Sequence, residues 1–151
     1  MKQYVTMKKI ENSKHYQGLE IGDHRFFCIG ELFSPYIRPN QLINWFHDEK
    51  TISDGNEWFE INKEHDVIAL YDIGDRMSDE TIFNLDPLKR FEMSRENFAE
   101  IIYQWEQLRV SRPDTILIVI DEDNHISLEA DPVIIKEYQD AGYAFDINKI
   151  E

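Results

Sequence analysis

The most regular pattern of apolar and polar positions in this chain begins at Ser94. Apolar side chains recur after it at intervals of three and four residues, which places them on one face of a helix: Phe98, Ile101, Ile102, Trp105 and Leu108. Ser94 is a favourable residue for the start of a helix, and Pro113 cannot continue one. The pattern therefore predicts a long amphipathic helix over about residues 94–112.

Two strand patterns follow this helix. Residues 115–120 are apolar at every position but the first and are rich in β-branched side chains, which is typical of a central strand buried on both faces. Residues 125–129 alternate between polar and apolar side chains, as in a strand with one face in water. The acidic segment 121–124 between them predicts the turn of a β-hairpin.

The remaining segments predict more strands and two shorter helices. We expect an antiparallel meander of strands over residues 3–10, 16–21 and 25–33, further strands at 57–62, 66–73, 81–85 and 89–93, and short helices at 39–47 and 132–141. Clusters of strands combined with one long helix predict an α+β fold. We expect a single domain over residues 1–151, with the long helix packed on a largely antiparallel sheet.

Composition supports a folded domain. The chain has 151 residues, of which 42% are hydrophobic and 13% aromatic, whereas disordered acidic chains are poor in aromatic residues. No apolar run approaches the ~20 residues of a membrane helix, and no apolar stretch follows the first lysines as it would in a signal peptide. The single cysteine, Cys28, lies in an apolar run and is expected to be a buried hydrophobic residue. These features predict a cytoplasmic protein.

Charge narrows the choice of partners. Thirty acidic and sixteen basic side chains give a net charge of −14, although residues 1–14 carry four lysines and one glutamate. Such a chain repels nucleic acid and anionic membranes and attracts basic protein surfaces. Negative charge also serves solubility alone, so the sequence leaves open whether the acidic surface is functional.

Two groups of acidic residues are candidates for metal binding, because carboxylates are the usual ligands of calcium and magnesium. Asp121, Asp123 and His125 stand at alternate positions, as in a calcium loop, but Ile126 and Pro132 occupy positions where that loop needs glycine and an acidic residue. The second group consists of Asp72, Asp75, Asp79 and Glu80 in an expected loop. The histidines have no zinc spacing, and the glycines form no phosphate-binding motif. We therefore predict no catalytic, metal or cofactor-binding residue.

Protein binding is the interpretation that these residues favour. We expect contacts with a basic partner from two acidic patches and one aromatic anchor: Asp72, Asp75, Asp79 and Glu80; Asp121, Glu122 and Asp123; and Trp58. Trp58 and Phe59 are adjacent in a strand pattern, so one of them faces away from the core unless a helix covers that side.

A small acidic α+β chain with these features resembles the immunity proteins of bacterial toxin systems, such as the polymorphic toxin and contact-dependent growth inhibition systems. The resemblance is one of class, and it covers size, charge and the order of strand, long helix and hairpin over about residues 88–130. It implies a non-enzymatic, cytoplasmic inhibitor, an antitoxin in bacterial competition, that binds a cognate basic toxin domain, often a nuclease. Two alternatives stay open: an adaptor or structural subunit of a larger assembly, and a carboxylate- or metal-dependent hydrolase.

Overall fold

The computed structural model of the protein describes residues 3–9, 16–19, 32–33, 38, 40–55, 59–72 and 90–141, and for residues 3–9, 16–19, 59 and 72 it describes the backbone only. The elements in chain order are β1 (Gln3–Lys9), β2 (Tyr16–Leu19), α2 (Gln41–His47), β3 (Ser53–Gly55), β4 (Phe59–Lys63), β5 (Val67–Asp72), β6 (Arg90–Ser94), α4 (Arg95–Ser111), β7 (Thr115–Ile120), β8 (Ile126–Glu129) and α5 (Pro132–Asp140).

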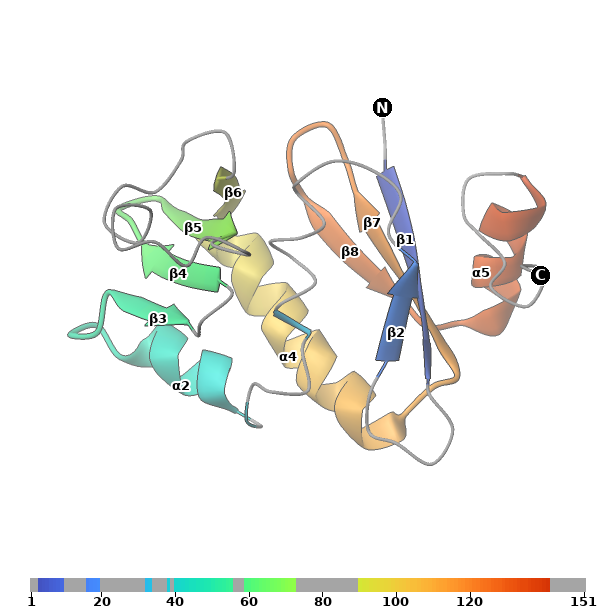
Figure 1. Ribbon diagram of the computed structural model, residues 1–151, viewed down its shortest axis with the longest axis horizontal. Coiled ribbons are helices and arrows are strands. Elements are labelled where there is room, and N and C mark those ends of the chain that lie inside the picture. Colours follow the sequence, from blue (N-terminus) through green and yellow to red (C-terminus); the bar gives the residue numbers. More distant parts are fainter. Residues whose placement is uncertain are drawn as a thin grey trace.

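The described strands form two antiparallel sheets. One has the strand order β2-β1-β7-β8 and the other the order β3-β4-β5-β6. Helix α4 runs across the molecule between them, α2 lies beside the second sheet, and α5 lies on the far side of the first (Figure 1). The expected α+β fold is confirmed. The antiparallel strands divide between two sheets, and the first of these contains the pairing of β1 with β7, a partner that local patterns do not reveal.

Helix α4 forms where the sequence predicts it. The Ser94 side chain accepts a hydrogen bond from the backbone N–H of Asn97 at 3.1 Å, and the helix ends at Arg112, which adopts a left-handed conformation with φ of 51°. Phe98, Ile101, Ile102 and Trp105 on its apolar face are buried, and Leu108 is partly buried against the same core. The predicted amphipathic helix is therefore confirmed.

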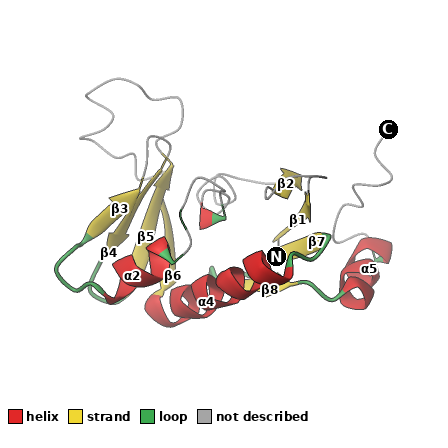
Figure 2. Ribbon diagram, turned by 90° about the horizontal axis from the view of Figure 1, so that it is seen from below, coloured by secondary structure: helices red, strands yellow, loops and turns green. Residues whose placement is uncertain are grey.

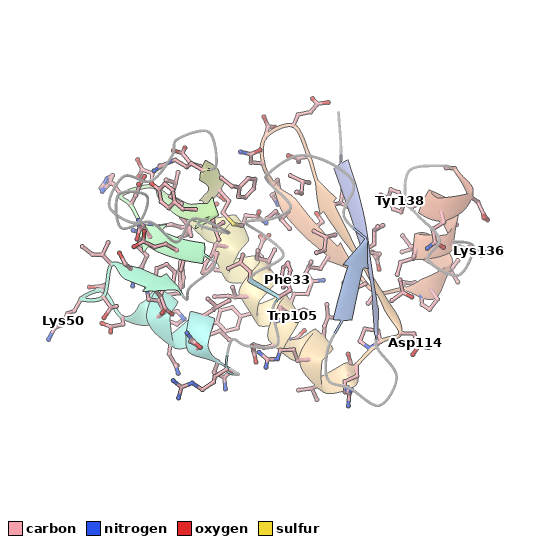
Figure 3. The ribbon with its side chains drawn as sticks, in the orientation of Figure 1. Phe33, Lys50, Trp105, Asp114, Lys136 and Tyr138 are labelled. Atoms are coloured by element: carbon pink, nitrogen blue, oxygen red, sulfur yellow. The ribbon has the colours of Figure 1, made fainter. Side chains whose placement is uncertain are left out.

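One hydrophobic core connects both sheets. Ile61, Ile68 and Phe91 enter it from the β3–β6 sheet, Ile116 and Ile118 enter it from the β1–β8 sheet, and the apolar face of α4 lies among them. Phe33 and Trp105 also belong to it. Their rings meet edge to face with centroids 4.8 Å apart, and they lie side by side at α4 in Figure 3. Shared side chains of this kind join the two sheets through α4.

Strand β7 is buried on both faces, as its sequence predicts. Ile116, Ile118 and Ile120 face the large core, whereas Leu117 and Val119 form a second cluster with Ile135 of α5. Tyr138 packs against this second cluster from the side of α5 that faces the sheet (Figure 3). The predicted hairpin is also confirmed, since β7 and β8 pair antiparallel with Ile120 opposite Ile126.

The first half of the chain differs from expectation in its details. Strand β1 pairs antiparallel with β2, as the first two strands of the expected meander would, and its other side pairs with β7, a long-range partner that was not expected. Leu32 lies in a helical turn and Phe33 in a turn, not at the end of a strand. The short strand β3 was not predicted. Residues 25–31, which include Cys28, and residues 81–85 lie outside the described residues.

Of the helices in the described ranges, none is long and apolar enough to cross a membrane.

Candidate protein-binding surface

The turn between β7 and β8 is held by the carboxylate of Asp121. Its Oδ1 atom accepts hydrogen bonds from the backbone N–H groups of Asp123, at 2.8 Å, and His125, at 3.0 Å. Asn124 adopts a left-handed conformation with φ of 61°, which asparagine tolerates better than most residues. Asp121 therefore has a structural role in the turn, while Glu122 and Asp123 are exposed at its end. We call residues 121–125 the hairpin tip.

The hairpin tip lies against two other elements. The Asn124 side chain donates a hydrogen bond from Nδ2 to the backbone oxygen of Glu92 in β6, at 3.1 Å. His125 Nε2 lies 3.8 Å from Glu100 Oε2 in α4, a separation at which a protonated imidazole pairs with a carboxylate. These contacts hold the hairpin tip against β6 and α4, so the exposed carboxylates of the tip and of α4 lie on elements that touch each other.

Helix α4 also covers the outer edge of β8. The buried side-chain amide of Asn97 donates to the backbone oxygen of Ile126 at 2.8 Å and accepts from its backbone N–H at 2.7 Å. Gln104 donates from Nε2 to the backbone oxygen of Leu128 at 2.9 Å. An open strand edge would offer these groups to another chain. Because α4 side chains bind them, the hairpin is fixed to the helix.

The solvent face of α4 carries a continuous stripe directly opposite the buried one. Its spacing of four and three residues keeps the members in line along the helix, and all of them are exposed. Figure 2 shows α4 along one border of the molecule, with β1, β4 and β5 on one side of it. We call this stripe the α4 surface; it consists of Glu96, Glu100, Tyr103, Gln107 and Val110.

Two members of the α4 surface are large apolar residues. The exposed fraction is 45% for Tyr103 and 85% for Val110. The Tyr103 hydroxyl is hydrogen bonded to Nε2 of His47, at the end of α2, with an O···N distance of 2.6 Å. Helix α2 therefore helps to hold the Tyr103 ring in place.

A second charged group, centred on Arg90, has a structural role. Its guanidinium donates to both carboxylate oxygens of Glu64 and also to the carboxylate of Glu92 and the hydroxyl of Tyr71. The hydrogen bonds from Arg90 lower the pKa of Glu64 below its ordinary value, and the same carboxylate raises the pKa of Arg90. Arg95 donates to the backbone oxygen of Glu64. These bonds join β6 and the first residue of α4 to the turn between β4 and β5.

Lys63 fastens α2 to β4. Its ammonium group donates to the backbone oxygens of Trp45 and Asp48 at the carboxyl end of α2 and lies 4.7 Å from the centre of the Trp45 ring. Burial lowers the pKa of Lys63, and the neighbouring carboxylate of Asp48 partly offsets that effect. The carboxylate of Asp48 accepts from the Thr51 hydroxyl at 2.7 Å and from the Lys50 N–H, which lowers the pKa of Asp48.

The described residues include no group of three or more His, Cys, Asp or Glu side chains placed to hold a metal ion. Asp121, Asp123 and His125 are thus joined by the turn's backbone hydrogen bonds and do not form such a group. The hairpin tip and the α4 surface carry exposed carboxylates, and such groups can bind Lys or Arg side chains of another protein.

The structure places part of the predicted contact set. Glu122 and Asp123 lie at the hairpin tip beside α4, and Asp72 is the last residue of β5, in register with Phe59 of β4. The other predicted contacts, Asp75, Asp79, Glu80 and Trp58, lie outside the described residues.

Tyr103 and Val110 were missed as candidate contacts. The signal was present in the helix pattern, because both residues fall at positions where an amphipathic helix normally carries polar side chains.

Comparison with models of known families, with curated proteins and with solved structures gave no match to this chain.

Proposed function

We propose that this protein is a small acidic protein-binding inhibitor of the immunity type, which binds a cognate basic toxin domain, of the nuclease class, and neutralises it. The observation that carries the proposal is the exposure of Glu96 and Glu100 on α4 and of Glu122 and Asp123 at the hairpin tip, two elements that are joined by the contact of His125 with Glu100. In this role the protein has no enzymatic activity of its own and acts in the cytoplasm as an antitoxin in bacterial competition.

Electrostatics supports such a partner. A nuclease groove that binds phosphates presents Lys and Arg side chains, and carboxylates on a rigid protein surface can occupy the same positive field. The net charge of −14 attracts this groove at long range and can steer association toward rates of about 10⁸–10⁹ M⁻¹s⁻¹ at low salt. Rapid capture suits an inhibitor that must act before the toxin meets its substrate.

Rigidity of the surface supports it as well. The amides of Asn97 and Gln104 fix β8 to α4, and Asn124 fixes the hairpin tip to β6. A surface that is already ordered loses little conformational entropy when it binds.

A second candidate function is an adaptor or subunit of a larger assembly. The observation that favours it is the exposure of two apolar residues on α5, with exposed fractions of 66% for Val133 and 36% for Ile134. Apolar contact is more typical of permanent assemblies than of salt-dependent capture.

The test of the proposal begins with capture by the tagged protein at low salt from a lysate of its own organism, with identification of what binds. The domain encoded beside its gene should be expressed separately as a candidate. We expect a one-to-one complex with a basic domain, loss of that domain's nuclease activity in the complex, and an affinity that falls as salt is raised. Recovery of a neutral or acidic assembly whose binding ignores salt would favour the adaptor, and an uninhibited toxin would exclude the inhibitor.

A further inference from the structure

We infer that the α4 surface is a docking face for a basic segment of the partner, which places Lys or Arg side chains on Glu96 and Glu100 and an apolar side chain on Tyr103. The inference rests on the proposed function and names the surface through which it acts.

The composition of this helix face points to a partner. The buried face of α4 supplies its contribution to the core, and neither Tyr103, which contacts His47 of α2, nor Val110 belongs to that core. Both residues lie on the exposed face of α4, each about one helical turn from Gln107, which lies between them. The exposed fraction is 45% for Tyr103 and 85% for Val110. Large exposed residues aligned on one helix face are typical of a contact with another protein.

Tyr103 has a fixed position on this face. Its hydroxyl is held by His47 at 2.6 Å, and tyrosine has few rotatable bonds. A partner that covers this ring therefore gains apolar contact at a small entropic cost, which is one reason why tyrosine is enriched among the residues that dominate binding energy.

Charge is unevenly distributed along the α4 surface. Glu96 and Glu100 lie in its first half, where the contact of His125 with Glu100 joins the helix to the acidic hairpin tip. The second half of the α4 surface is uncharged. The occupant that complements this face is therefore basic at one end and apolar at the other.

Charge also decides between a partner protein and a second copy of this chain. Two copies bring together net charges of −14 each, and that repulsion opposes self-association. A basic partner is attracted by the same field.

The experiment uses the whole protein, labelled with ¹⁵N, and a synthetic helical peptide as the probe. The peptide carries lysines spaced to meet Glu96 and Glu100 and one leucine placed to meet Tyr103. Two comparison peptides have the leucine replaced by serine or the lysines replaced by glutamate. Amide shifts locate the binding site and a titration at low salt gives the affinity. We expect the first peptide to shift resonances of α4 and the hairpin tip, and both comparison peptides to bind more weakly.

Protein variants test the named residues. We expect Tyr103→Ala to weaken the first peptide about tenfold, as for a residue that dominates an interface, and the double reversal Glu96→Lys with Glu100→Lys to weaken it at least as much. The matched control reverses two exposed carboxylates on α5, Glu137→Lys with Asp140→Lys, which changes net charge equally and should leave affinity within about threefold. Far-ultraviolet circular dichroism verifies that each variant folds.

Four results would overturn the inference: no binding of the first peptide, shifts centred elsewhere, equal losses in the two double reversals, or sedimentation of the free protein as a dimer that Tyr103→Ala dissolves. None of these decides the proposed function, which is judged on the captured partner and its activity. An inhibited basic partner that binds another face would retain the function and exclude this docking face.

Discussion

Asn97 is a buried polar residue whose side-chain amide donates a hydrogen bond to the backbone oxygen of Ile126 and accepts one from the backbone N–H of the same residue. The exposed fraction of Asn97 is 3%, and its two hydrogen bonds with Ile126 measure 2.7 and 2.8 Å. Buried backbone groups that lose their partners cannot turn to water, and each such loss is expensive. Asn97 thus completes the outer edge of β8 in the way that a neighbouring strand would.

The replacement Asn97→Ala should therefore destabilise the fold strongly. It leaves the N–H and the C=O of Ile126 without these bonds, and we expect the free energy of unfolding to fall by about 2–4 kcal/mol in urea denaturation. The matched control is Gln104→Ala, which removes one bond from a more exposed side chain and should cost about 1 kcal/mol. Equal losses in the two variants would contradict this role for Asn97.

Glu64 makes a pH-dependent contribution to stability. Hydrogen bonds from Arg90 lower its pKa in the folded protein below the ordinary value of 4.5. A carboxyl group with a depressed folded-state pKa contributes stability above its unfolded pKa and loses that contribution as pH falls through the folded value. The contribution is therefore complete near neutral pH and absent in strong acid.

We expect Glu64→Gln to lower the free energy of unfolding at neutral pH by at most about 1 kcal/mol, because 39% of the Glu64 side chain is exposed and water screens the pair. The difference from the natural protein should shrink as pH falls below about 4.5. Urea denaturation over a pH series measures it, with Glu137→Gln on an exposed turn of α5 as control. A difference that stays constant across the series would exclude the Arg90 pairing as its source.

At the scale of elements, the start of α4 depends on one side chain. The Ser94 hydroxyl accepts a hydrogen bond from the backbone N–H of Asn97 and so satisfies a group that the first turn leaves open. Ser94→Ala should cost about 1 kcal/mol of unfolding free energy in thermal or urea denaturation.

Ser111→Ala, at the other end of the helix, supplies the control for this prediction. The Ser111 hydroxyl lies 3.5 Å from the backbone oxygen of Leu108, a long hydrogen bond, so its loss should change stability by only a few tenths of a kcal/mol. Equal losses of unfolding free energy in Ser94→Ala and Ser111→Ala would show that the Ser94 cap does not stabilise the helix more than an ordinary surface hydroxyl does.

The sequence predicts those helices and strands that are determined by residues close together in the chain. Helix α4 follows from apolar spacing with Ser94 before it, and the hairpin follows from two strand patterns around an acidic turn. The pairing of β1 with β7 joins residues that are more than a hundred positions apart, and no local pattern specifies it. Strand β3 has three residues, too few to show a period.

The candidate surface could be predicted only in part for the same reason. Glu122 and Asp123 stand out in the sequence as an acidic turn, but the contact of this turn with α4, through His125 and Glu100, results from the packing of the hairpin against the helix. The structural use of Asp121 also depends on the turn's geometry, which places two backbone N–H groups on its carboxylate. Tyr103 could have been found from its position in the helix pattern alone.

At the scale of the whole molecule, α4 is shared by both sheets. Phe98, Ile101 and Trp105 lie in one continuous core with Ile68 of the β3–β6 sheet and Ile118 of the β1–β8 sheet. Loss of either sheet would therefore expose one side of the helix to water, and burial of that surface is the main favourable term in folding. The two sheets should accordingly unfold together.

We expect one cooperative transition, in which tryptophan fluorescence and far-ultraviolet circular dichroism give the same midpoint in urea. Ile68→Ala and Ile118→Ala each open a cavity at a site with at most 2% exposure, so each should lower the free energy of unfolding of that single transition by about 2–5 kcal/mol. Val110→Ala, at a position 85% exposed, should change it by less than about 0.5 kcal/mol. Two separate transitions, of which Ile68→Ala moves one and Ile118→Ala the other, would show that the sheets fold independently and that α4 belongs to only one of them.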